Sequence, residues 1–306
     1  MAPAKPVEVE VEGRRLRLSN LDKVLYPEVG FTKGQVIDYY TRAAPWLLPH
    51  LRGRALTLKR YPNGVEGGHF YEKQKPSHAP EWVSSQRISA GDKRIDFVLC
   101  DDLPTLVWLA NLADLELHPS LALAEDPDSP TVMAFDLDPG APAALAECCR
   151  VALMLRDVLD QLGLECHVKT SGSKGMQIYV PLSSGVTYHD TKPFAHGLAR
   201  VLEAREPDLV VSVMKKELRR GKVFIDWSQN DRHKTTVGPY SLRAVTGPSV
   251  STPLAWPEVE RAVEQGHADD LVFEAGDVLD RLAEHGDPFA PVVERRQELP
   301  DLSRAQ

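Results

Sequence analysis

The sequence has few cysteines and no long apolar run. Its four cysteines, Cys100, Cys148, Cys149 and Cys166, show no CxxC spacing, so we predict buried thiols rather than a zinc knuckle, a redox pair or a disulfide. No apolar run approaches the roughly 18 to 20 residues that span a bilayer, and the N-terminus lacks the layout of a signal peptide. These absences predict a cytoplasmic protein with no membrane partner.

The composition is that of an ordinary globular protein, but the charge is uneven. The 306 residues are 42% apolar and 26% charged, which is enough to bury a large core. The net charge is −8, and the stretch from Glu258 to Gln306, with 13 acidic and 5 basic residues, accounts for all of it. The window from Met214 to Lys234 instead holds seven basic and three acidic residues. Such a patch attracts a phosphate backbone or forms a solvated helix face.

An apolar run that ends in two acids, TVMAFDLDPG at residues 131–140, predicts a buried strand carrying Asp136 and Asp138 at its end. Side chains alternate along a strand, so positions 136 and 138 share a face. Two such carboxylates repel each other unless a cation lies between them, and Mg²⁺ or Mn²⁺ binds carboxylates together with substrate phosphates. A solvated acid pair fits this stretch equally well, and a haloacid-dehalogenase-type phosphatase begins with a similar strand end.

A third acid ends a later strand. The segment VFIDW predicts a strand with Asp226 near its end, and three such carboxylates are typical of a two-metal site. Between the acid-bearing strands, the SGSKG loop brings Ser171, Ser173 and Lys174 together with backbone N–H groups, a suitable cradle for phosphates. The P-loop pattern GxxxxGK[ST] is absent. Arg243 adds a positive group that suits a triphosphate.

The N-terminal half contains further candidate contacts with nucleic acid. An alternating ribbon over residues 6–18 is followed by Lys23 and Lys33, which lie near helix starts and suit a phosphate clamp, although surface lysines are common. A Gly-rich loop carries Phe70 and Tyr71, whose rings either stack on exposed bases or fold inward over a small core.

Periodicity and capping residues place the other elements. We predict strands at residues 55–60, 82–100, 165–170, 176–181 and 209–211, and helices from Thr32 to Trp46 and at 105–113, 141–162 and 187–204. Beyond Pro248, acidic helices run to Gly286 and precede a Pro-rich tail.

The motifs FDLDPG, TSGSKG and FIDWSQN occur in this order, together with SNLDKVLYP, a GxHFYEK loop, ELHPS and PYSLR. Through them the chain resembles the archaeo-eukaryotic primase superfamily, most of all the polymerase module of bacterial ligase D, the end-joining DNA ligase, over residues 14–285. The resemblance implies an α/β (α+β) primase-polymerase fold, with an RRM-like catalytic sheet packed against an N-terminal α/β half. It implies a single domain over 1–290, made of a DNA-end half at 1–125, a catalytic core at 126–250 and an acidic helical part at 251–290, followed by a flexible tail at 291–306.

The resemblance also implies roles for individual residues. Asp136, Asp138 and Asp226 would be catalytic and bind two ions, with Mn²⁺ preferred over Mg²⁺. The residues that would contact the incoming nucleotide are Lys59, His118, Ser171, Ser173, Lys174, Gln229 and Arg243. Those that would recognise a 5′-phosphate on the downstream DNA strand are Asn20, Lys23 and Lys33. Phe70 and Tyr71 would stack on the template base, with Tyr71 replacing a second Phe, and Arg219 would handle the primer or the opposing break end.

Together these features predict template-directed nucleotidyl transfer, in which a primer 3′-hydroxyl attacks the α-phosphate of an NTP or dNTP and pyrophosphate leaves. The resemblance implies gap filling and end extension in bacterial non-homologous end joining at the nucleoid, a preference for ribonucleotides, and a Ku-like end binder and a separate DNA ligase as partners. Because the chain has no KxDG ligase motif and no HxH-type nuclease cluster, we expect an excised module or a free-standing polymerase. The scattered cysteines argue against a replicative primase.

Two alternatives remain open. A non-catalytic DNA-end binding or bridging module would use Lys23, Lys33 and the basic turn, but it leaves three strand-end acids unexplained. A metal-dependent phosphatase or nuclease would use the same acids without needing the SGSKG loop or Arg243.

Overall fold

The chain divides into two compact units in the computed structural model, which describes residues 6–90 and 93–300. Each unit combines segments that are distant in the sequence, so the division differs from the consecutive segments expected from the sequence. Unit 1 comprises Met1–Ser120, Thr235–Thr252 and Phe273–Asp287, and unit 2 comprises Leu121–Lys234, Pro253–Val272 and Pro288–Gln306.

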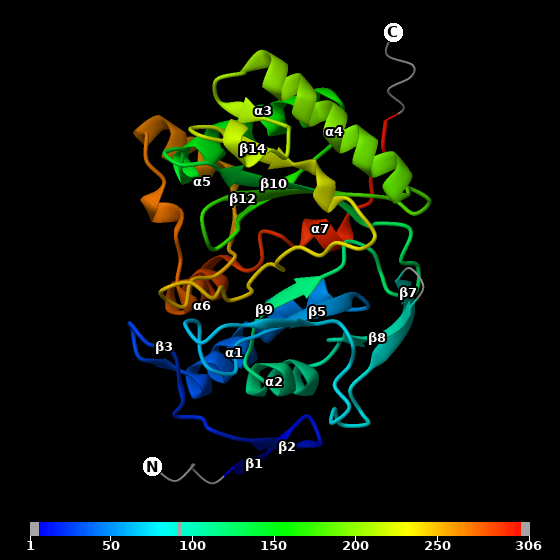
Figure 1. Ribbon diagram of the computed structural model, residues 1–306, viewed down its shortest axis with the longest axis vertical. Helices are drawn as coiled ribbons and strands as arrows, with labels where there is room; N and C mark the ends of the chain where they lie inside the picture. The colour runs from blue at the N-terminus through cyan, green and yellow to red at the C-terminus, as the bar shows by residue number, and fades with distance from the viewer. Residues whose placement is uncertain (1–5, 91–92, 301–306) are drawn as a thin grey trace. The chain divides into compact units, whose positions relative to one another are not determined.

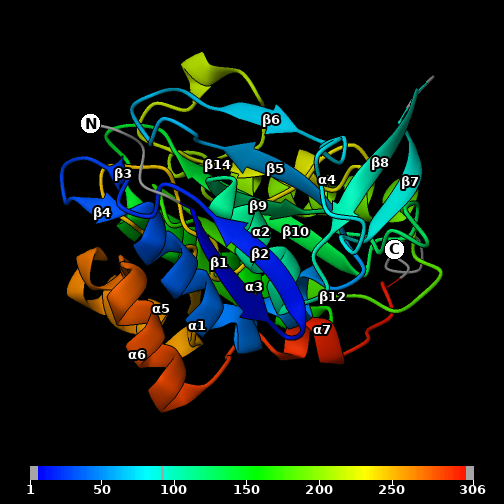
Figure 2. The same ribbon diagram turned by 90° about the horizontal axis from the view of Figure 1, so that it is seen from below.

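Unit 1 combines helices with a mainly antiparallel sheet. Its elements are β1 (Val7–Val11), β2 (Arg14–Leu18), β3 (Val24–Tyr26), β4 (Phe31–Thr32), α1 (Lys33–Leu51), β5 (Ala55–Arg60), β6 (Phe70–Glu72), β7 (Ser85–Ala90), β8 (Lys93–Leu99), α2 (Leu103–Asn111), β9 (Asp114–Pro119) and α6 (Ala275–His285). The main sheet has the order β6-β5-β8-β7, and β9 pairs with β5. The predicted ribbon is the β1–β2 hairpin, which contacts α2 (Figure 2).

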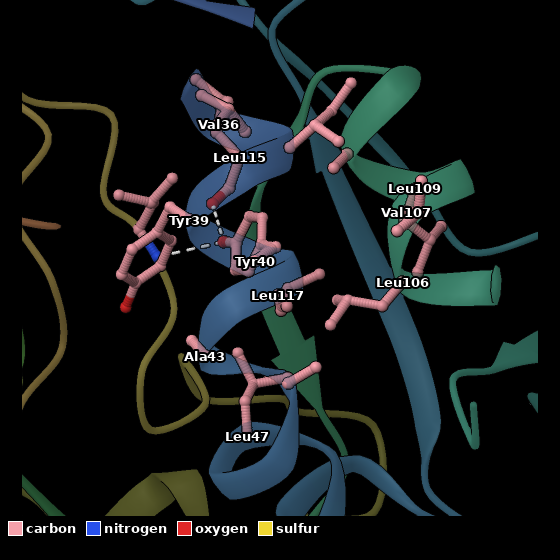
Figure 3. Packing of buried hydrophobic residues seen from close by; sticks show 14 of the residues in the cluster. Val36, Tyr39, Tyr40, Ala43, Leu47, Leu106, Val107, Leu109, Leu115 and Leu117 are labelled. Carbon is pink, nitrogen blue, oxygen red and sulfur yellow. Dashed lines mark hydrogen bonds between the residues drawn. The ribbon is translucent and has the colours of Figure 1, made fainter. Parts of the chain in front are cut away.

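The core of unit 1 forms around α1. Thr32 caps this helix in a reciprocal box with Gln35, as its position in the sequence predicts. In Figure 3, the apolar face of α1 packs against α2 and β9. The buried Tyr40 hydroxyl donates to Leu115 O of β9 at 2.6 Å and accepts from Leu242 N at 3.0 Å. These bonds hold β9 and the strand-like stretch around Leu242 in place, and both contribute side chains to the candidate site described below.

Unit 2 contains the predicted RRM-like sheet. Its elements are β10 (Val132–Pro139), α3 (Leu145–Gln161), β11 (His167–Thr170), β12 (Met176–Pro181), α4 (Tyr188–Arg205), β13 (Val210–Val211), the 3₁₀ turn η1 (Lys216–Leu218), β14 (Val223–Asp226), the 3₁₀ turn η2 (Trp227–Gln229), β15 (Pro253–Leu254), α5 (Trp256–Gln265), the 3₁₀ turn η3 (Asp269–Leu271) and α7 (Pro291–Glu294). The strand order is β13-β14-β10-β12-β11-β15. The elements β10, α3, β11, β12, α4 and β14 follow the β-α-β-β-α-β order, with β10 and β12 central and β13 added beside β14, which confirms the predicted sheet.

The two faces of this sheet have different surroundings. Helices α3 and α4 cover one face (Figure 1), where Cys149 Sγ of α3 lies 3.6 Å from Met176 Sδ of β12. On the other face, the Tyr179 ring meets Phe289 at 5.3 Å between centroids. Tyr179 is opposite Ala134 of β10, so Asp136, two residues further on, lies on this second face.

The predicted elements are otherwise largely present, and all four cysteines are free and buried as predicted. In the described part of the chain, no helix is long and apolar enough to cross a membrane. The segment predicted to be a flexible tail makes contacts with the rest of unit 2 over its first part. Val292 of α7 is buried, and Gln297 donates to the backbone oxygens of Glu165 and Pro181. Residues 301–306 of that tail lie outside the described residues.

Candidate active site

Strand pairing in unit 2 brings two of the predicted metal ligands together. Asp136 of β10 lies directly opposite Asp226 of β14, and on its other side directly opposite Gln177 of β12. Gln177 in turn lies opposite Lys169 of β11. Directly opposite residues of antiparallel strands share a face. The order Asp226, Asp136, Gln177, Lys169 is therefore a polar row across four strands, on the face that α3 and α4 leave uncovered.

Asp136 is the most perturbed carboxylate of the row. Burial, followed by the charge of Asp138, raises its pKa to about 6, and Asp226 adds to this rise. The hydrogen bond from Gln177 Nε2 to Asp136 Oδ1, 3.2 Å long, and the positive charge of the fully buried Lys169 act in the opposite direction. The raised pKa of Asp136 thus reflects burial first and the neighbouring negative charges second, and a bound cation would relieve both.

Asp226 is held by the turn that follows it. Its Oδ1 accepts from Ser228 N at 3.0 Å and from the Ser228 hydroxyl at 2.5 Å, and its Oδ2 accepts from Gln229 Nε2 at 2.8 Å. The Lys234 ammonium donates to the Ser228 hydroxyl, so a cation is linked to Asp226 through one hydroxyl. Gln229, assigned to the nucleotide by the resemblance, therefore lies beside a predicted metal ligand.

Asp138 is more exposed and forms an ion pair with Arg219. The Arg219 Nη1 lies 3.5 Å from Asp138 Oδ2, Nη2 donates to Met214 O at 2.7 Å, and the guanidinium carbon lies 3.7 Å from the Phe224 ring centroid. The loop that carries Arg219 passes close to the end of β10, because a Cβ added at Gly140 would lie 2.0 Å from Arg219 O. Arg219, the residue assigned to the primer or opposing end, is thus fixed next to the acid strand.

The donor set of the three acids fits Mn²⁺ or Mg²⁺, because both ions prefer carboxylate oxygens. The raised pKa of Asp136 agrees with such a role. In the orientations described, however, the carboxylates are engaged by Gln177, Arg219 and the η2 turn, and no group of three His, Cys, Asp or Glu side chains within residues 6–90 and 93–300 is arranged to hold a metal ion. The strand positions fit a metal site, whereas the present side-chain orientations do not form one.

The SGSKG loop lies beside the acid strand. It connects β11 to β12, and a Cβ at Gly175 would lie only 2.0 Å from Leu137 O of β10. Ser171 is buried and closes the loop, since its hydroxyl accepts from Ser173 N at 3.3 Å and Gly175 N at 3.2 Å. Ser173 and Lys174 are exposed. The structure therefore gives Ser171 a part in shaping the loop and leaves Ser173 and Lys174 accessible to a ligand.

The other predicted nucleotide contacts gather in unit 1 around a residue that the sequence did not single out. The buried Glu116 lies 2.9 Å from Lys59 Nζ, 3.0 Å from His118 Nε2 and 3.4 Å from Arg243 Nε. It also accepts from the Tyr61 hydroxyl at 3.0 Å. Lys59, His118 and Arg243, which come from three separate segments, thus meet at this one carboxylate.

These contacts decide the charge of the cluster. Burial opposes ionisation of Glu116, but the hydrogen bond with His118 and the charges of Arg243 and Lys59 hold the pKa of Glu116 well below its usual value. Burial lowers the pKa of His118, while Glu116 raises it and Arg243 and Lys59 lower it. The cluster therefore contains a buried, ionised carboxylate between two basic side chains.

The two predicted stacking rings lie on opposite faces of β6. Tyr71 pairs with Lys59 and Phe70 with Arg60 across β5 and β6. Lys59 Nζ lies 5.6 Å from the Tyr71 ring centroid, and the Arg60 guanidinium carbon lies 5.1 Å from the Phe70 centroid. Both rings are exposed. Tyr71 thus belongs to the face of the Glu116 cluster, and the two rings do not form one stacking surface.

The lysines assigned to a 5′-phosphate are neighbours at the start of α1. Lys33 N donates to Lys23 O at 2.8 Å, and Lys33 Nζ donates to Ser19 O at 2.6 Å. Lys23 Nζ donates to Asn63 Oδ1 at 3.3 Å. Burial, followed by the charge of Lys23, lowers the pKa of Lys33 to about 8. Asn20, with φ of 55°, forms the turn that precedes Lys23. Two cations at a helix N-terminus without acids in its first turn favour an anion.

Sequence reasoning missed Glu116, Gln177, Lys169 and Lys234. A signal existed for Glu116, because the alternation in DLELHP places Asp114, Glu116 and His118 on one strand face. No local signal identified Gln177 or Lys169, whose relation to Asp136 depends on pairing between distant strands.

A family model for the LigD primase-polymerase domain matches residues 32–289, which is most of the chain. The chain belongs to this family. Unit 2 of this primase-polymerase domain holds the three acids and the SGSKG loop, and unit 1 holds the Glu116 cluster, the β6 rings and the lysine pair. The resemblance inferred from the motifs is confirmed.

Individual relatives agree with this assignment. The multifunctional non-homologous end joining protein LigD of Mycolicibacterium smegmatis is 42% identical over 280 residues, covering 91% of this chain and 36% of that protein. The bifunctional non-homologous end joining protein LigD of Bacillus subtilis is 31% identical over 287 residues, covering 94% of this chain and 45% of that protein. The chain therefore spans less than half the length of these curated relatives.

A solved structure confirms the fold of this LigD-type domain. The polymerase domain from Mycobacterium tuberculosis ligase D, in complex with DNA, matches with a TM-score of 0.86 and 38% sequence identity. The match covers 92% of this chain and 99% of that chain. The predicted primase-polymerase fold is thus confirmed.

Proposed function

We propose that this domain is a template-directed nucleotidyltransferase that fills gaps and extends ends in bacterial non-homologous end joining. The observation that carries the proposal is the arrangement in unit 2. The SGSKG loop contacts the same strand that carries Asp136 and Asp138, and Asp226 lies directly opposite Asp136. The groups that would bind phosphate and metal therefore lie side by side, which supports a transfer reaction on a nucleoside triphosphate.

The proposed reaction joins the primer 3′-oxygen to the α-phosphorus and breaks the bond to the β-phosphate, releasing pyrophosphate. Asp136, Asp138 and Asp226 would hold two Mn²⁺ or Mg²⁺ ions. Such ions, when bound, favour ionisation of the attacking hydroxyl and neutralise charge on the leaving pyrophosphate. Ser173 and Lys174 are exposed on the loop and would bind phosphate oxygens directly.

The other site residues would orient substrates. Lys59, His118 and Arg243 form a basic group that suits the triphosphate, and Gln229 orients Asp226. Lys23 and Lys33, with Asn20 shaping the turn, would bind a 5′-phosphate on the downstream strand. Support for DNA as a partner comes from the similar polymerase domain of M. tuberculosis ligase D, which was solved with DNA. The preference for ribonucleotides and for Mn²⁺, and the Ku-like and ligase partners, rest on the family resemblance.

The test uses a gapped duplex with a downstream 5′-phosphate, Mn²⁺ and labelled nucleotides, resolved on a denaturing gel. Template-directed growth of the primer supports the proposal, shortening of the primer supports a nuclease, and no change in the primer supports an end-binding module. Asp138→Ala is expected to abolish growth while binding of the 5′-phosphorylated duplex, measured by fluorescence anisotropy, stays close to that of the wild type. Extension by this variant at the normal rate would remove the metal assignment.

The end-binding alternative has one observation in its favour, the Lys23 and Lys33 pair beside the α1 N-terminus. Comparing Lys23→Ala with Asp226→Ala separates the two functions. A polymerase loses extension in Asp226→Ala, whereas an end-binding module is affected only by Lys23→Ala. Asp157→Ala, an exposed acid of α3 paired with Arg156, serves as the control for removal of an unrelated carboxylate.

A further inference from the structure

The buried carboxylate of Glu116 binds several charged and polar groups, although the sequence analysis assigned it no role. Its side chain is 2% exposed. Oε1 lies 2.9 Å from Lys59 Nζ and accepts from the Tyr61 hydroxyl at 3.0 Å and from Ala244 N at 3.2 Å. Oε2 lies 3.0 Å from His118 Nε2 and 3.4 Å from Arg243 Nε. Both oxygens are therefore saturated by groups from three chain segments.

The strand register explains how the carboxylate reaches this position. Glu116 of β9 lies directly opposite Lys59 of β5, and His118 lies opposite Thr57 on the same face. Across the other edge of β5, Tyr71 of β6 lies opposite Lys59. The stretch that carries Arg243 is fixed separately by the Ser241 hydroxyl, which accepts from Leu117 N at 2.9 Å. An isolated buried carboxylate costs several kcal/mol, so its retention here depends on the surrounding cations.

The Glu116 cluster holds more basic groups than an internal ion pair would need. The Glu116 carboxylate faces two basic side chains, Lys59 and Arg243, and a histidine. Glu116 alone cannot neutralise both cations. Asp114, on the same strand face, accepts from Lys59 N, and burial raises its pKa well above the usual value, which favours its uncharged form and leaves the cluster with an excess of positive charge. One carboxylate paired with one cation would leave no excess charge. An excess of positive charge beside the exposed ring of Tyr71 instead suits an anionic ligand.

We propose that Glu116 is a positioning residue that holds His118, Lys59 and Arg243 as one preorganised array for the phosphates of the incoming nucleotide. The inference rests on the proposed nucleotidyltransferase function. Glu116 itself does not contact the nucleotide, because its oxygens are occupied by the groups that do. Its contribution is to remove the cost of ordering three flexible or titratable side chains when the nucleotide binds.

The array also determines which protonation state of His118 would bind a phosphate. With Nε2 engaged by Glu116, Nδ1 is the ring nitrogen left for a ligand, and it can donate to a phosphate oxygen only when the ring is protonated. The groups facing the ring are Glu116, Arg243, Lys59 and Tyr71. Of these, Glu116 favours the protonated ring, whereas Arg243 and Lys59 oppose it. Loss of the carboxylate therefore lowers the pKa of His118.

The direct test measures the His118 pKa by ¹H–¹⁵N NMR in the protein without nucleotide or DNA, with the signal assigned from His118→Ala. Glu116→Gln keeps the shape of the side chain and removes its charge, and is expected to lower the His118 pKa by about one unit or more. Glu116→Asp keeps the charge, and its His118 pKa is expected to lie between those of the wild type and Glu116→Gln. An unchanged pKa in Glu116→Gln overturns the inference.

The second readout is primer extension at varied nucleotide concentration and pH. Glu116→Gln is expected to raise the nucleotide KM about tenfold, with a smaller effect on kcat, because the array acts in binding. The rise of KM with pH should move to lower pH, following the His118 pKa. A KM that stays at the wild-type value while the pKa falls overturns the role in nucleotide binding.

Further variants keep the test decisive. If Glu116→Gln does not fold, as judged by circular dichroism, Glu116→Asp carries both readouts, and unchanged values there overturn the inference. Tyr61→Phe removes one hydrogen bond to Glu116 but no charge, and should leave the His118 pKa close to that of the wild type. Absence of extension by the wild-type protein would refute the proposed function, whereas the NMR titration would still decide whether Glu116 positions His118.

Discussion

Asp136 and Asp226 lie directly opposite each other on the antiparallel strands β10 and β14. This relationship joins two acids that are far apart in the sequence and accounts for part of the raised pKa of Asp136, after burial and the charge of Asp138. Because Asp138 lies two residues along the same strand, all three carboxylates belong to one end of one sheet. The candidate chemistry of this domain therefore depends on the pairing of β10 with β14.

Binding of Mn²⁺ at this sheet end should stabilise the fold. A ligand that binds only the folded state at 100 times its dissociation constant adds about 2.7 kcal/mol to the free energy of unfolding. We expect Mn²⁺ to raise the melting temperature of the wild type, and Asp226→Asn to abolish most of that rise. Asp157→Asn should respond to Mn²⁺ as the wild type does. Differential scanning calorimetry with and without Mn²⁺ measures the effect, and an equal rise in Asp226→Asn would contradict the assignment.

Gly175→Ala should displace the SGSKG loop from the strand that carries Asp136 and Asp138. The new Cβ would lie 2.0 Å from Leu137 O, a backbone atom that cannot move aside without disturbing β10. We expect a loss of about 2 kcal/mol or more in the free energy of unfolding, measured by urea titration. Gly197→Ala is the matched control, because the Cβ added there, inside α4, meets nothing within 4 Å apart from its own chain neighbours and nearby helix backbone, and the change should be neutral or stabilising. Equal stability of the two variants would refute the close contact.

Binding of a 5′-phosphate should weaken with rising pH through the titration of Lys33. Its pKa in the free protein is about 8, below the usual 10.5 because of burial and then the Lys23 charge. A phosphate dianion favours the protonated lysine, so binding takes up a proton above pH 8 and the affinity falls by up to about tenfold per pH unit. Anisotropy with 5′-phosphate and 5′-hydroxyl DNA at constant ionic strength measures this, and only the phosphorylated DNA should show the fall.

The lowered pKa of Lys33 also makes the free energy of unfolding depend on pH. Its lowered pKa means that the folded state disfavours the charged form, so Lys33 contributes stability that is fully present above pH 10.5 and lost as pH falls through about 8. Lys33→Met removes this contribution. Its free energy of unfolding should therefore vary less between pH 7 and pH 10 than that of the wild type.

Tyr71 and Phe70 should have separable effects, because they lie on opposite faces of β6. Stacking of a base on an aromatic ring is worth about 1–3 kcal/mol. With 2-aminopurine at the templating position, we expect Tyr71→Leu to abolish the quenching caused by stacking and to raise the nucleotide KM about tenfold. Phe70→Leu should keep the quenching. Loss of quenching in both variants would show that the rings act as one surface.

The sequence by itself determined the features that depend on near neighbours. The alternation in VEVEVEGRRLRL predicted the β1–β2 hairpin, and Thr32 predicted the start of α1, because strand alternation and helix capping act over a few residues. For the same reason, the positions of Asp136, Asp138 and Asp226 at strand ends were predictable. The order of the motifs was specific enough to identify the family.

Only the tertiary structure decided which of these residues meet. The register of β14 on β10 places Asp226 opposite Asp136, and the register of β9 on β5 places Glu116 opposite Lys59. The hydrogen bond from Leu117 N to the Ser241 hydroxyl fixes the separate stretch that brings Arg243 to Glu116. Phe70 and Tyr71 lie on opposite faces because the predicted loop contains the short strand β6, which the sequence did not predict. These relationships depend on hydrogen bonds and packing between segments that are distant in the chain. Because many registers satisfy the same local pattern, the energy that selects one of them comes from the assembled sheet and core.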